Sequence, residues 1–294
     1  MEKVKSDKKI KSAVLGGDAR QNAVADALAK IADTVTWGMP DGHINAIIAE
    51  SWHDAVKDAD LVVLPLPVTK DGIRLNAPSV SEPPEITEII DKMKKASIIA
   101  AGKVPPFVKK YAAESGVRII DYFELEGVQI KNAVPTAEGA AEIAMHELPR
   151  TIMGAKAAVI GYGRVGRTLA QTMLSLKADV TCIARSERDL AWASVDGCKT
   201  VKLSAFIAAP AEFDVIFNTV PSPVITADVI GKLTNKPLII DLAAAPGGTD
   251  FAAAADAGIK AQLASSLPGK TSPETAGEII ADAIISLLEQ EAMI

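Results

Sequence analysis

Three glycines in the middle of the chain are spaced as in loops that bind the pyrophosphate of a dinucleotide. Gly161, Gly163 and Gly166 follow the apolar segment 157–160 and precede a segment with apolar residues at helical spacing. The first glycine permits a tight turn, the second lets the backbone approach the phosphates, and the third lets the helix pack against the strand. Because N–H groups at a helix N-terminus attract anions, the pattern predicts a nucleotide site.

The next strand-like segment ends in residues that suit a 2′-phosphate. Sites for NAD usually place Asp or Glu about 20 residues after the glycines, where the carboxylate accepts hydrogen bonds from the ribose. This chain has Ala184, Arg185 and Ser186 there, with Arg188 just beyond. A guanidinium can form two charge-assisted hydrogen bonds with a phosphate, and a serine hydroxyl can add a third. We therefore expect NADP(H) rather than NAD(H); the alternative is that Arg185 is a solvated loop arginine.

Two later segments should complete the cofactor site and supply a base. Residues 218–221 and 241–243 each follow an apolar segment, at the strand ends that line such cofactors. Asp241 is a candidate base, with a structural carboxylate as the alternative, and Glu138 is a second candidate, with helix capping as its alternative. The predicted cofactor-binding residues are Gly161, Gly163, Arg164, Val165, Gly166, Ala184, Arg185, Ser186, Arg188, Asn218, Thr219, Val220, Pro221, Leu242 and Ala243.

The N-terminal half opens with a weaker version of the glycine-rich phrase. Gly16 and Gly17 follow an apolar segment, but the third glycine is missing and Asp18 would repel a pyrophosphate. We therefore expect this half to bind substrate rather than nucleotide. Arg20 is the first candidate for a substrate carboxylate, with pairing to Asp18 or to a helix terminus as the alternative.

Two other segments could bind a second carboxylate. Lys103 follows an apolar strand-like segment, and residues 268–272 lead into a helix N-terminus, which favours anions. The alternatives are a solvated loop lysine and simple helix capping. The predicted substrate-binding residues are Gly17, Asp18, Arg20, Gln21, Lys103, Lys270 and Thr271.

Alternating strand-like and helix-like segments must position these residues. The alternation predicts an α/β fold with two Rossmann-like, doubly wound parallel-sheet domains. We place an N-terminal substrate domain at residues 1–131 and an NADP-binding domain at 132–294, with a bridging helix at 136–152 capped by Thr136. A C-terminal helix at 273–291, with Ser272 as N-cap, is expected to pack back on the first domain by analogy with other two-domain dehydrogenases.

Composition excludes several classes of protein. The 294 residues are 49% hydrophobic and 23% charged, which suits a packed globular chain, and the net charge of −6 argues against non-specific nucleic-acid binding. No run is long and apolar enough to span a membrane. The two cysteines and the three histidines, His43, His53 and His146, have no spacing typical of a disulfide framework or metal site. We expect a cytoplasmic protein without a metal.

Several phrases resemble one family, the A subunit of bacterial dipicolinate synthase. The phrases at 16–21 and 241–250 are specific to that family, and the glycine-rich turn is generic. Further matching phrases lie at 134–139, 184–186, 218–221 and 267–277, so the resemblance spans nearly the whole chain.

The resemblance implies an activity and a partner. The activity is NADP-dependent oxidation of dihydrodipicolinate, or of its hydroxy-tetrahydro precursor, to dipicolinate. The partner is the flavoprotein-like B subunit of the same synthase, and the setting is the cytoplasm of the mother cell of a spore-forming bacterium. Assembly of several copies of the chain is left open.

Two other functions also stay open at this point. One is an NADP-dependent dehydrogenase of another small carboxylate, although a hydroxyacid oxidation usually employs a histidine paired with a carboxylate. His146 falls in the middle of a predicted helix rather than at a strand end. The other is a noncatalytic NADPH-binding scaffold that assembles the B subunit.

Overall fold

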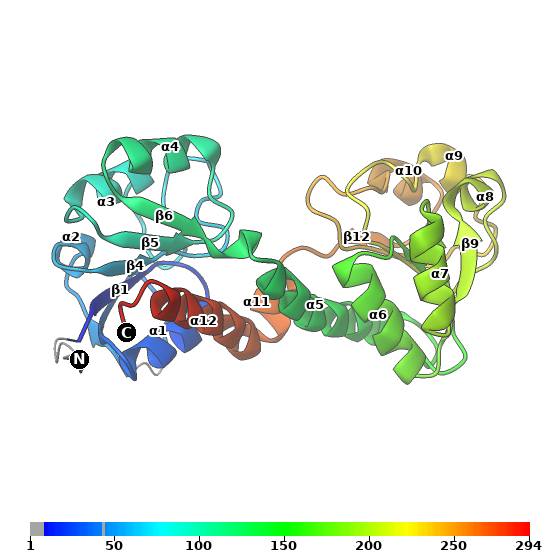
Figure 1. The fold of residues 1–294 in the computed structure, drawn as a ribbon. Helices are drawn as coiled ribbons and strands as arrows, with labels where there is room; N and C mark the ends of the chain where they lie inside the picture. The colour runs from blue at the N-terminus through cyan, green and yellow to red at the C-terminus, as the bar shows by residue number, and fades with distance from the viewer. Residues whose placement is uncertain (1–8, 43–44) are drawn as a thin grey trace. The chain divides into compact units, whose positions relative to one another are not determined.

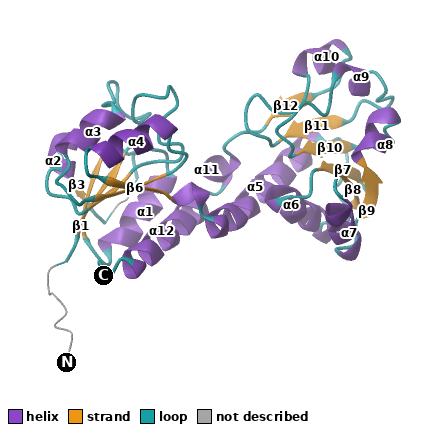
Figure 2. Cartoon of the chain, turned by 45° about the horizontal axis from the view of Figure 1, so that its top comes forward, coloured by secondary structure: helices purple, strands orange, loops and turns teal. Residues whose placement is uncertain are grey.

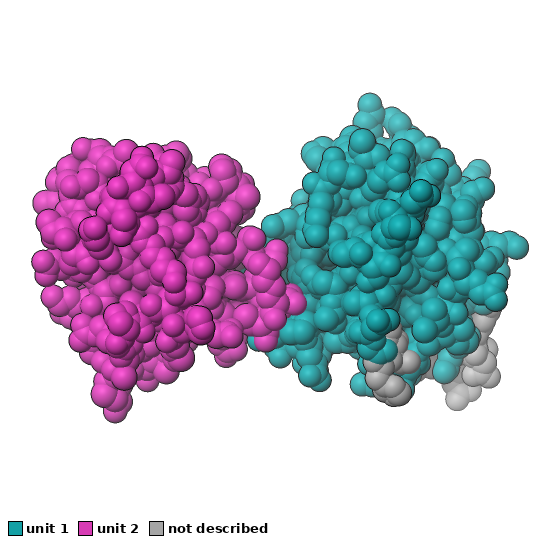
Figure 3. Space-filling view, turned by 180° about the vertical axis from the view of Figure 1, so that it is seen from behind, with its two compact units in different colours: residues 1–131, 272–294 teal, residues 132–271 magenta. Residues whose placement is uncertain are grey.

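The computed structural model describes residues 9–42 and 45–294, so His43 lies outside the described residues (Figure 1). The chain forms two compact units (Figure 3). Unit 1 comprises Met1–Lys131 and Ser272–Ile294, and unit 2 comprises Asn132–Thr271. Strands and helices alternate along both units, as an α/β fold requires (Figure 2).

Unit 1 contains a six-stranded parallel sheet in the order β3-β2-β1-β4-β5-β6. Its elements are β1 (Lys11–Leu15), α1 (Arg20–Ala29), β2 (Asp33–Trp37), β3 (Ile47–Ile48), α2 (Trp52–Val56), β4 (Leu61–Val63), α3 (Ile86–Lys92), β5 (Ile98–Ala101), α4 (Pro106–Glu114), β6 (Arg118–Asp121), the 3₁₀ turn η1 (Tyr122–Glu124) and α12 (Pro273–Gln290). Helices α1 and α12 lie side by side on one face of the sheet, and α2, α3 and α4 cover the other (Figure 1).

Unit 2 repeats this topology with a second six-stranded parallel sheet, in the order β12-β11-β10-β7-β8-β9. Its elements are β7 (Lys156–Ile160), α6 (Arg164–Ser175), β8 (Asp179–Ala184), α7 (Glu187–Val195), β9 (Lys199–Lys202), α8 (Leu203–Ala208), β10 (Val215–Asn218), α9 (Ala227–Ile230), β11 (Leu238–Asp241), α10 (Phe251–Asp256), β12 (Ala261–Leu263) and α11 (Leu267–Thr271). The prediction of two Rossmann-like parallel-sheet domains is confirmed.

The helix expected at 136–152 begins earlier and also ends earlier than the sequence predicts. It is α5, Glu126–Glu147, with Pro135 in its interior. Thr136 is not its N-cap, because the Thr136 hydroxyl donates to the carbonyl of Asn132 inside the helix. Buried residues such as Val128 and Ala137 continue on both sides of the proline. Their burial outweighs the single backbone hydrogen bond that proline removes, so the helix does not stop there.

Helix α12 belongs to unit 1 although it follows unit 2 in the chain. The apolar residues Ile280, Ile284 and Leu288 are buried in the same cluster as Val24 and Leu28 of α1. The expected packing of the C-terminal helix on the first domain is thus confirmed, and the range 132–294 expected for the second domain ends at residue 271. Ser272 occupies the N-cap position but makes no side-chain capping hydrogen bond.

No helix among the described residues is long and apolar enough to cross a membrane. Within the same residues, no group of three or more His, Cys, Asp or Glu side chains is arranged to hold a metal ion.

Candidate functional site

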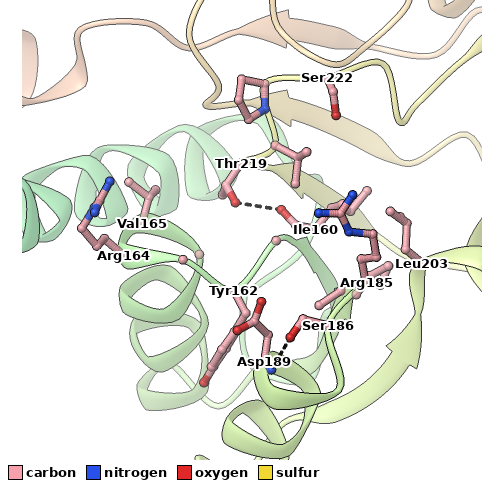
Figure 4. Close-up of a pocket in the computed structure, with 17 residues that line it drawn as sticks. Ile160, Tyr162, Arg164, Val165, Arg185, Ser186, Asp189, Leu203, Thr219 and Ser222 are labelled. Carbon is pink, nitrogen blue, oxygen red and sulfur yellow. Dashed lines mark hydrogen bonds between the residues drawn. The ribbon is translucent and has the colours of Figure 1, made fainter.

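The glycine-rich turn of unit 2 is shaped by close contacts that leave no room for side chains. Gly161 follows β7 with a φ of +91°, and a Cβ there would lie 2.4 Å from Thr219 Oγ1. A Cβ on Gly166 would lie 2.2 Å from the carbonyl oxygen of Gly161. The Thr219 hydroxyl itself donates to the carbonyl of Ile160 at 2.8 Å, which fixes this turn to the end of β10 (Figure 4).

Gly163 differs from the other two glycines because a Cβ on it would meet nothing within 4 Å. It is the N-cap of α6, which begins at Arg164. The backbone there faces open space at a helix N-terminus, as close approach of a phosphate requires.

A cavity of about 460 Å³ opens beside this turn. Most of the predicted cofactor-binding residues line it: Gly161, Gly163, Arg164, Val165, Gly166, Ala184, Arg185, Ser186, Thr219, Val220 and Pro221. Arg188, Asn218, Leu242 and Ala243 are not among its lining residues. Asp189, Leu203 and Ser222 also line the cavity and were missed by the sequence analysis. Asp189 could have been found, because it lies in the first turn of the helix that follows Ser186.

The rim of the cavity beyond β8 carries a free cation. Arg185 is exposed, and no hydrogen bond or ion pair involves its side chain in the described ranges. The Ser186 hydroxyl accepts a hydrogen bond from the backbone N–H of Asp189 at 3.4 Å and so caps α7 (Figure 4). Arg188 Nη2 lies 3.3 Å from Asp189 Oδ1. The acidic group at the rim is thus paired with Arg188, and Arg185 remains available to an anion.

Asp241 is fully buried, and its carboxylate accepts four hydrogen bonds. Oδ1 accepts from the backbone N–H of Ala243 at 3.0 Å. Oδ2 accepts from the Gly248 N–H at 2.8 Å, the Thr249 hydroxyl at 2.7 Å and Asn218 Nδ2 at 3.1 Å. The side chain is 0% exposed and does not line the cavity, so its burial and these hydrogen bonds favour the structural alternative over a base.

The same arrangement explains the positions of Asn218, Leu242 and Ala243. Asn218 is fully buried, accepts from Val220 N–H through Oδ1 and donates through Nδ2 to the carbonyl of Val220. The Leu242 N–H donates to the carbonyl of Asn218. These hydrogen bonds join the loops after β10 and β11 on their buried side. Asn218 therefore does not line the cavity, although the residues that follow it do.

Sequence reasoning also missed a polar network behind the glycine turn. The Tyr162 hydroxyl donates to Asp196 Oδ2 at 2.6 Å, and Arg167 Nε donates to the same oxygen at 2.8 Å. The hydrogen bonds from Tyr162 and Arg167 hold the pKa of Asp196 below its ordinary value. Burial and the hydrogen bond to Asp196 raise the pKa of Tyr162. No spacing signal could have found Asp196, because the fold alone brings it to the turn.

The remaining candidates in the second half of the chain lie in helices. Glu138 is exposed in the middle of α5, so its alternative as a cap at a helix start is wrong. Residues 268–271 form part of α11 rather than a turn, and the Thr271 hydroxyl donates to the carbonyl of Leu267 at 3.0 Å. Lys270 belongs to the same short helix.

In unit 1, Arg20 is largely buried and engaged by the protein. Its Nε and Nη2 atoms donate to the Asp18 carboxylate at 2.8 and 2.7 Å, and Nη2 also donates to the carbonyl of Leu66. The alternative of pairing with Asp18 is therefore the one that the structure shows. Lys103 has a φ of +54°, and its ammonium group lies 5.2 Å from the centroid of the Phe123 ring, a cation–π distance.

Comparisons with known proteins assign both halves of the chain. Residues 11–123 match the family described as the N-terminal domain of the dipicolinate synthase A subunit. Residues 130–245 match the NAD-binding domain of D-isomer-specific 2-hydroxyacid dehydrogenases. The dipicolinate synthase A subunit of Bacillus subtilis (strain 168) is 33% identical over 286 residues, which cover 96% of each chain.

Solved structures agree with this assignment. The crystal structure of the dipicolinate synthase A subunit from Bacillus halodurans superposes with a TM-score of 0.86 at 31% identity and covers 95% of this chain and 97% of its own. The structure of the Bacillus subtilis protein gives a TM-score of 0.86 at 32% identity and covers 98% of both chains. A transhydrogenase from Sinorhizobium meliloti, with a TM-score of 0.70 at 15% identity and coverage of 95% and 94%, shares the fold.

The site and these matches agree on a nicotinamide dinucleotide as the cofactor and on an oxidoreductase as the class of enzyme. The specific phrases of the sequence, the two parallel sheets and the full-length matches all lead to one assignment. The chain belongs to the family of dipicolinate synthase A subunits.

Proposed function

We propose that this chain catalyses the NADP-dependent oxidation of dihydrodipicolinate, or of its hydroxy-tetrahydro precursor, to dipicolinate. The observation that carries the proposal is the cavity of unit 2, where an open helix N-terminus and a free arginine accompany full-length similarity to this family. The setting that goes with it is the cytoplasm of the mother cell of a spore-forming bacterium.

The choice of NADP rests on the residues after β8. A carboxylate that would accept hydrogen bonds from a ribose diol is replaced by Ala184, and the free guanidinium of Arg185 lines the cavity. The Ser186 hydroxyl accepts from a backbone N–H, and its own proton remains available for a phosphate oxygen. A 2′-phosphate would pair with Arg185 through charge-assisted hydrogen bonds, which a ribose hydroxyl cannot match.

The residues of unit 2 also suit the rest of the cofactor. Gly161 and Gly166 form a cradle that a Cβ would fill, and Gly163 leaves the start of α6 open to the pyrophosphate. When bound, the nicotinamide supplies the hydride acceptor. The buried pair Asn218 and Asp241 orients the loops at the ends of β10 and β11.

The main task of the protein in this reaction is to position the substrate against the nicotinamide. Loss of a hydride and a proton from the ring of dihydrodipicolinate leaves an aromatic pyridine, so the oxidation is downhill once the groups are aligned. The hydroxy-tetrahydro precursor must lose water as well, which gives dihydrodipicolinate before the hydride is transferred. A small dicarboxylate substrate needs anion subsites, and the candidates for them are Gly17, Asp18, Arg20, Gln21 and Lys103 in unit 1 and Lys270 and Thr271 in unit 2. Because Asp241 is fully buried and does not line the cavity, Glu138, which is exposed on α5, is the proposed base.

The proposal includes a partner. The relatives are named as the A component of a synthase, and we infer that this chain acts with the B subunit of the same synthase. The requirement for the B subunit is part of the test below.

The experiment follows NADPH absorbance after mixing the chain, NADP⁺ and freshly generated dihydrodipicolinate precursor, with and without the B subunit. We expect NADPH and the ultraviolet absorbance of pyridine-2,6-dicarboxylate to rise together, and the comparison shows whether this chain suffices. If the pyridine forms at the uncatalysed rate while NADP⁺ stays oxidised in both samples, the proposal is wrong. An NADPH-binding scaffold would then account better for the cavity.

A further inference from the structure

The cavity of unit 2 carries an acidic side chain on the same rim as its free cation. Asp189 lies in the first turn of α7, and both Asp189 and Arg185 line the cavity. Figure 4 shows the Asp189 side chain directed from α7 toward the glycine-rich turn, beside Ser186. One rim of the cavity therefore holds two opposite charges, and only the positive one suits a phosphate.

The cap of α7 does not engage the Asp189 carboxylate. Ser186 is the N-cap, and its hydroxyl accepts from the backbone N–H of Asp189. In a full capping box, the acidic side chain three residues after the N-cap would also accept from the N-cap N–H. Within the described residues no hydrogen bond joins the Asp189 carboxylate to the Ser186 N–H. The carboxylate is therefore left to face the cavity.

Arg188 neutralises this carboxylate only weakly. Its Nε and Nη2 atoms both donate to Asp189 Oδ1, each at a long 3.3 Å. The Arg188 side chain is 82% exposed, and an ion pair so open to solvent contributes little free energy. Among the described residues, Asp189 Oδ2 accepts no hydrogen bond. An acceptor oxygen with most of its charge thus remains at the rim.

A carboxylate at this place can take a role that the end of β8 lacks. Dinucleotide sites of this fold usually bind the ribose 2′-hydroxyl with an acidic residue at the end of the second strand. Here that strand is β8, and its last residue is Ala184. Because α7 follows β8 directly, it returns the carboxylate of Asp189 to the same end of the cavity.

We propose that Asp189 faces the adenosine ribose and opposes Arg185 in the choice between the two nicotinamide dinucleotides. Its carboxylate accepts a hydrogen bond from the 2′-hydroxyl of NAD(H) and repels the 2′-phosphate of NADP(H), which Arg185 attracts. The chain therefore binds both dinucleotides, and Asp189 limits the preference for NADP(H). The inference rests on the proposed function for the cofactor and adds a specificity-determining residue to it.

The test replaces Asp189 by asparagine, which has the same shape without the charge. Affinities of the full chain for NADPH and NADH are measured by fluorescence titration, and the thermal midpoint checks folding. We expect NADPH to bind about threefold more tightly and NADH about threefold more weakly, so that the affinity ratio shifts about tenfold. The gain for NADPH should shrink at high salt, because salt screens a partly exposed charge.

A matched control removes the same charge from the same helical turn. Glu187 is 73% exposed, pairs with Lys202 at 2.5 Å and does not line the cavity, so Glu187→Gln should leave the NADPH-to-NADH affinity ratio unchanged. Adenosine 2′,5′-bisphosphate and AMP carry the ribose with and without the 2′-phosphate. Their affinities should respond to Asp189→Asn as those of NADPH and NADH do, which assigns the effect to the ribose.

Three outcomes would overturn the inference. An unchanged affinity ratio in Asp189→Asn shows that the carboxylate does not face the ribose. Weaker binding of both dinucleotides shows that Asp189 shapes the start of α7 instead, and an equal shift in Glu187→Gln shows a general effect of charge. Failure of the proposed function looks different: the affinity ratio would shift as expected, but no NADPH would form from the dihydrodipicolinate precursor.

Discussion

The first strand of each unit is followed by a glycine in the left-handed region, and a helix begins three or four residues after that glycine. Gly16 after β1 has a φ of +62°, and Gly161 after β7 has a φ of +91°. Around these similar turns the chemistry differs. In unit 2 the space before α6 is open at Gly163, whereas in unit 1 the ion pair between Asp18 and Arg20 occupies the start of α1.

The comparison shows that the topology of the sheet selects the place of a site and the loop residues select its ligand. Both sheets reverse their strand order next to the first strand, and both present helix N-termini at that point. Only unit 2 keeps the open approach that a pyrophosphate needs. Unit 1 has a carboxylate there, together with an amide that lacks a partner.

The largest effect is expected from giving unit 2 the acidic turn of unit 1. Gly163 has extended backbone (φ −79°, ψ −163°) and open space, so Gly163→Asp should fold normally. Its carboxylate would face the pyrophosphate, and we expect NADPH affinity to fall about 100-fold in a fluorescence titration. Gly163→Asn has the same shape without the charge and should lose much less. Equal losses in the two variants would show that size rather than charge distinguishes the units.

The second prediction concerns α12, which unit 1 needs and unit 2 lacks. A Cβ on Gly277 would lie 2.2 Å from the carbonyl oxygen of Arg20 and 2.7 Å from Ala23 Cβ. Gly277→Ala should therefore cost about 1–3 kcal/mol in denaturant unfolding by forcing α12 away from α1. Gly127→Ala, in a helix where a Cβ meets nothing within 4 Å, should be neutral or slightly stabilising. A neutral Gly277→Ala would contradict this close packing.

A smaller effect is expected on the affinity for NADPH relative to NADH, which measures recognition of the 2′-phosphate alone. Arg185→Ala removes the free guanidinium at the rim of the cavity and should weaken NADPH binding about tenfold while leaving NADH binding nearly unchanged. Lys199→Ala serves as the control, because Lys199 is exposed, pairs with Asp179 and does not line the cavity. Equal losses for NADPH and NADH in Arg185→Ala would argue against recognition of the 2′-phosphate.

The smallest effect should come from the hydrogen bonds of Tyr162 and Arg167 to Asp196, behind the glycine turn of unit 2. The pKa of Asp196 is lowered in the folded state, so its hydrogen bonds stabilise the protein above the ordinary carboxyl pKa. That stability is lost as the pH falls below about 4. Asp196→Asn should therefore flatten the acid side of the plot of thermal midpoint against pH. Parallel curves for the two proteins would show that the network does not contribute.

The cofactor site was largely predictable from sequence because its parts lie close together in the chain. The turn at 161–166 and the strand end at 184–186 form one continuous strand–turn–helix–strand unit, and local geometry controls each step. The later strand ends near Thr219 and Ala243 could be located in the same way. Whether each of these residues faces the cavity or the core could not be predicted from the sequence. Asn218, for example, is fully buried in the core.

Two sequence interpretations were decided by the same physical cause. Thr136 was predicted to be a helix N-cap, and Asp241 was a candidate base with a structural carboxylate as its alternative. Burial of apolar side chains carries α5 past Thr136, and donors from the loop after β11 hold the buried Asp241 carboxylate. In both cases a tertiary contact outweighs a local preference.

The sequence by itself determined the α/β class, the doubled Rossmann-like design, the glycine turn and the family. These follow from periodicity, turn residues and phrases that need no knowledge of distant contacts. Tertiary structure alone decided which polar groups are engaged: Arg20 is engaged by Asp18 and Leu66, Asp241 by its own loop, and Gln21 Nε2 by no described residue. The physical reason is that a hydrogen bond depends on positions within about 3 Å, which only the packed chain defines.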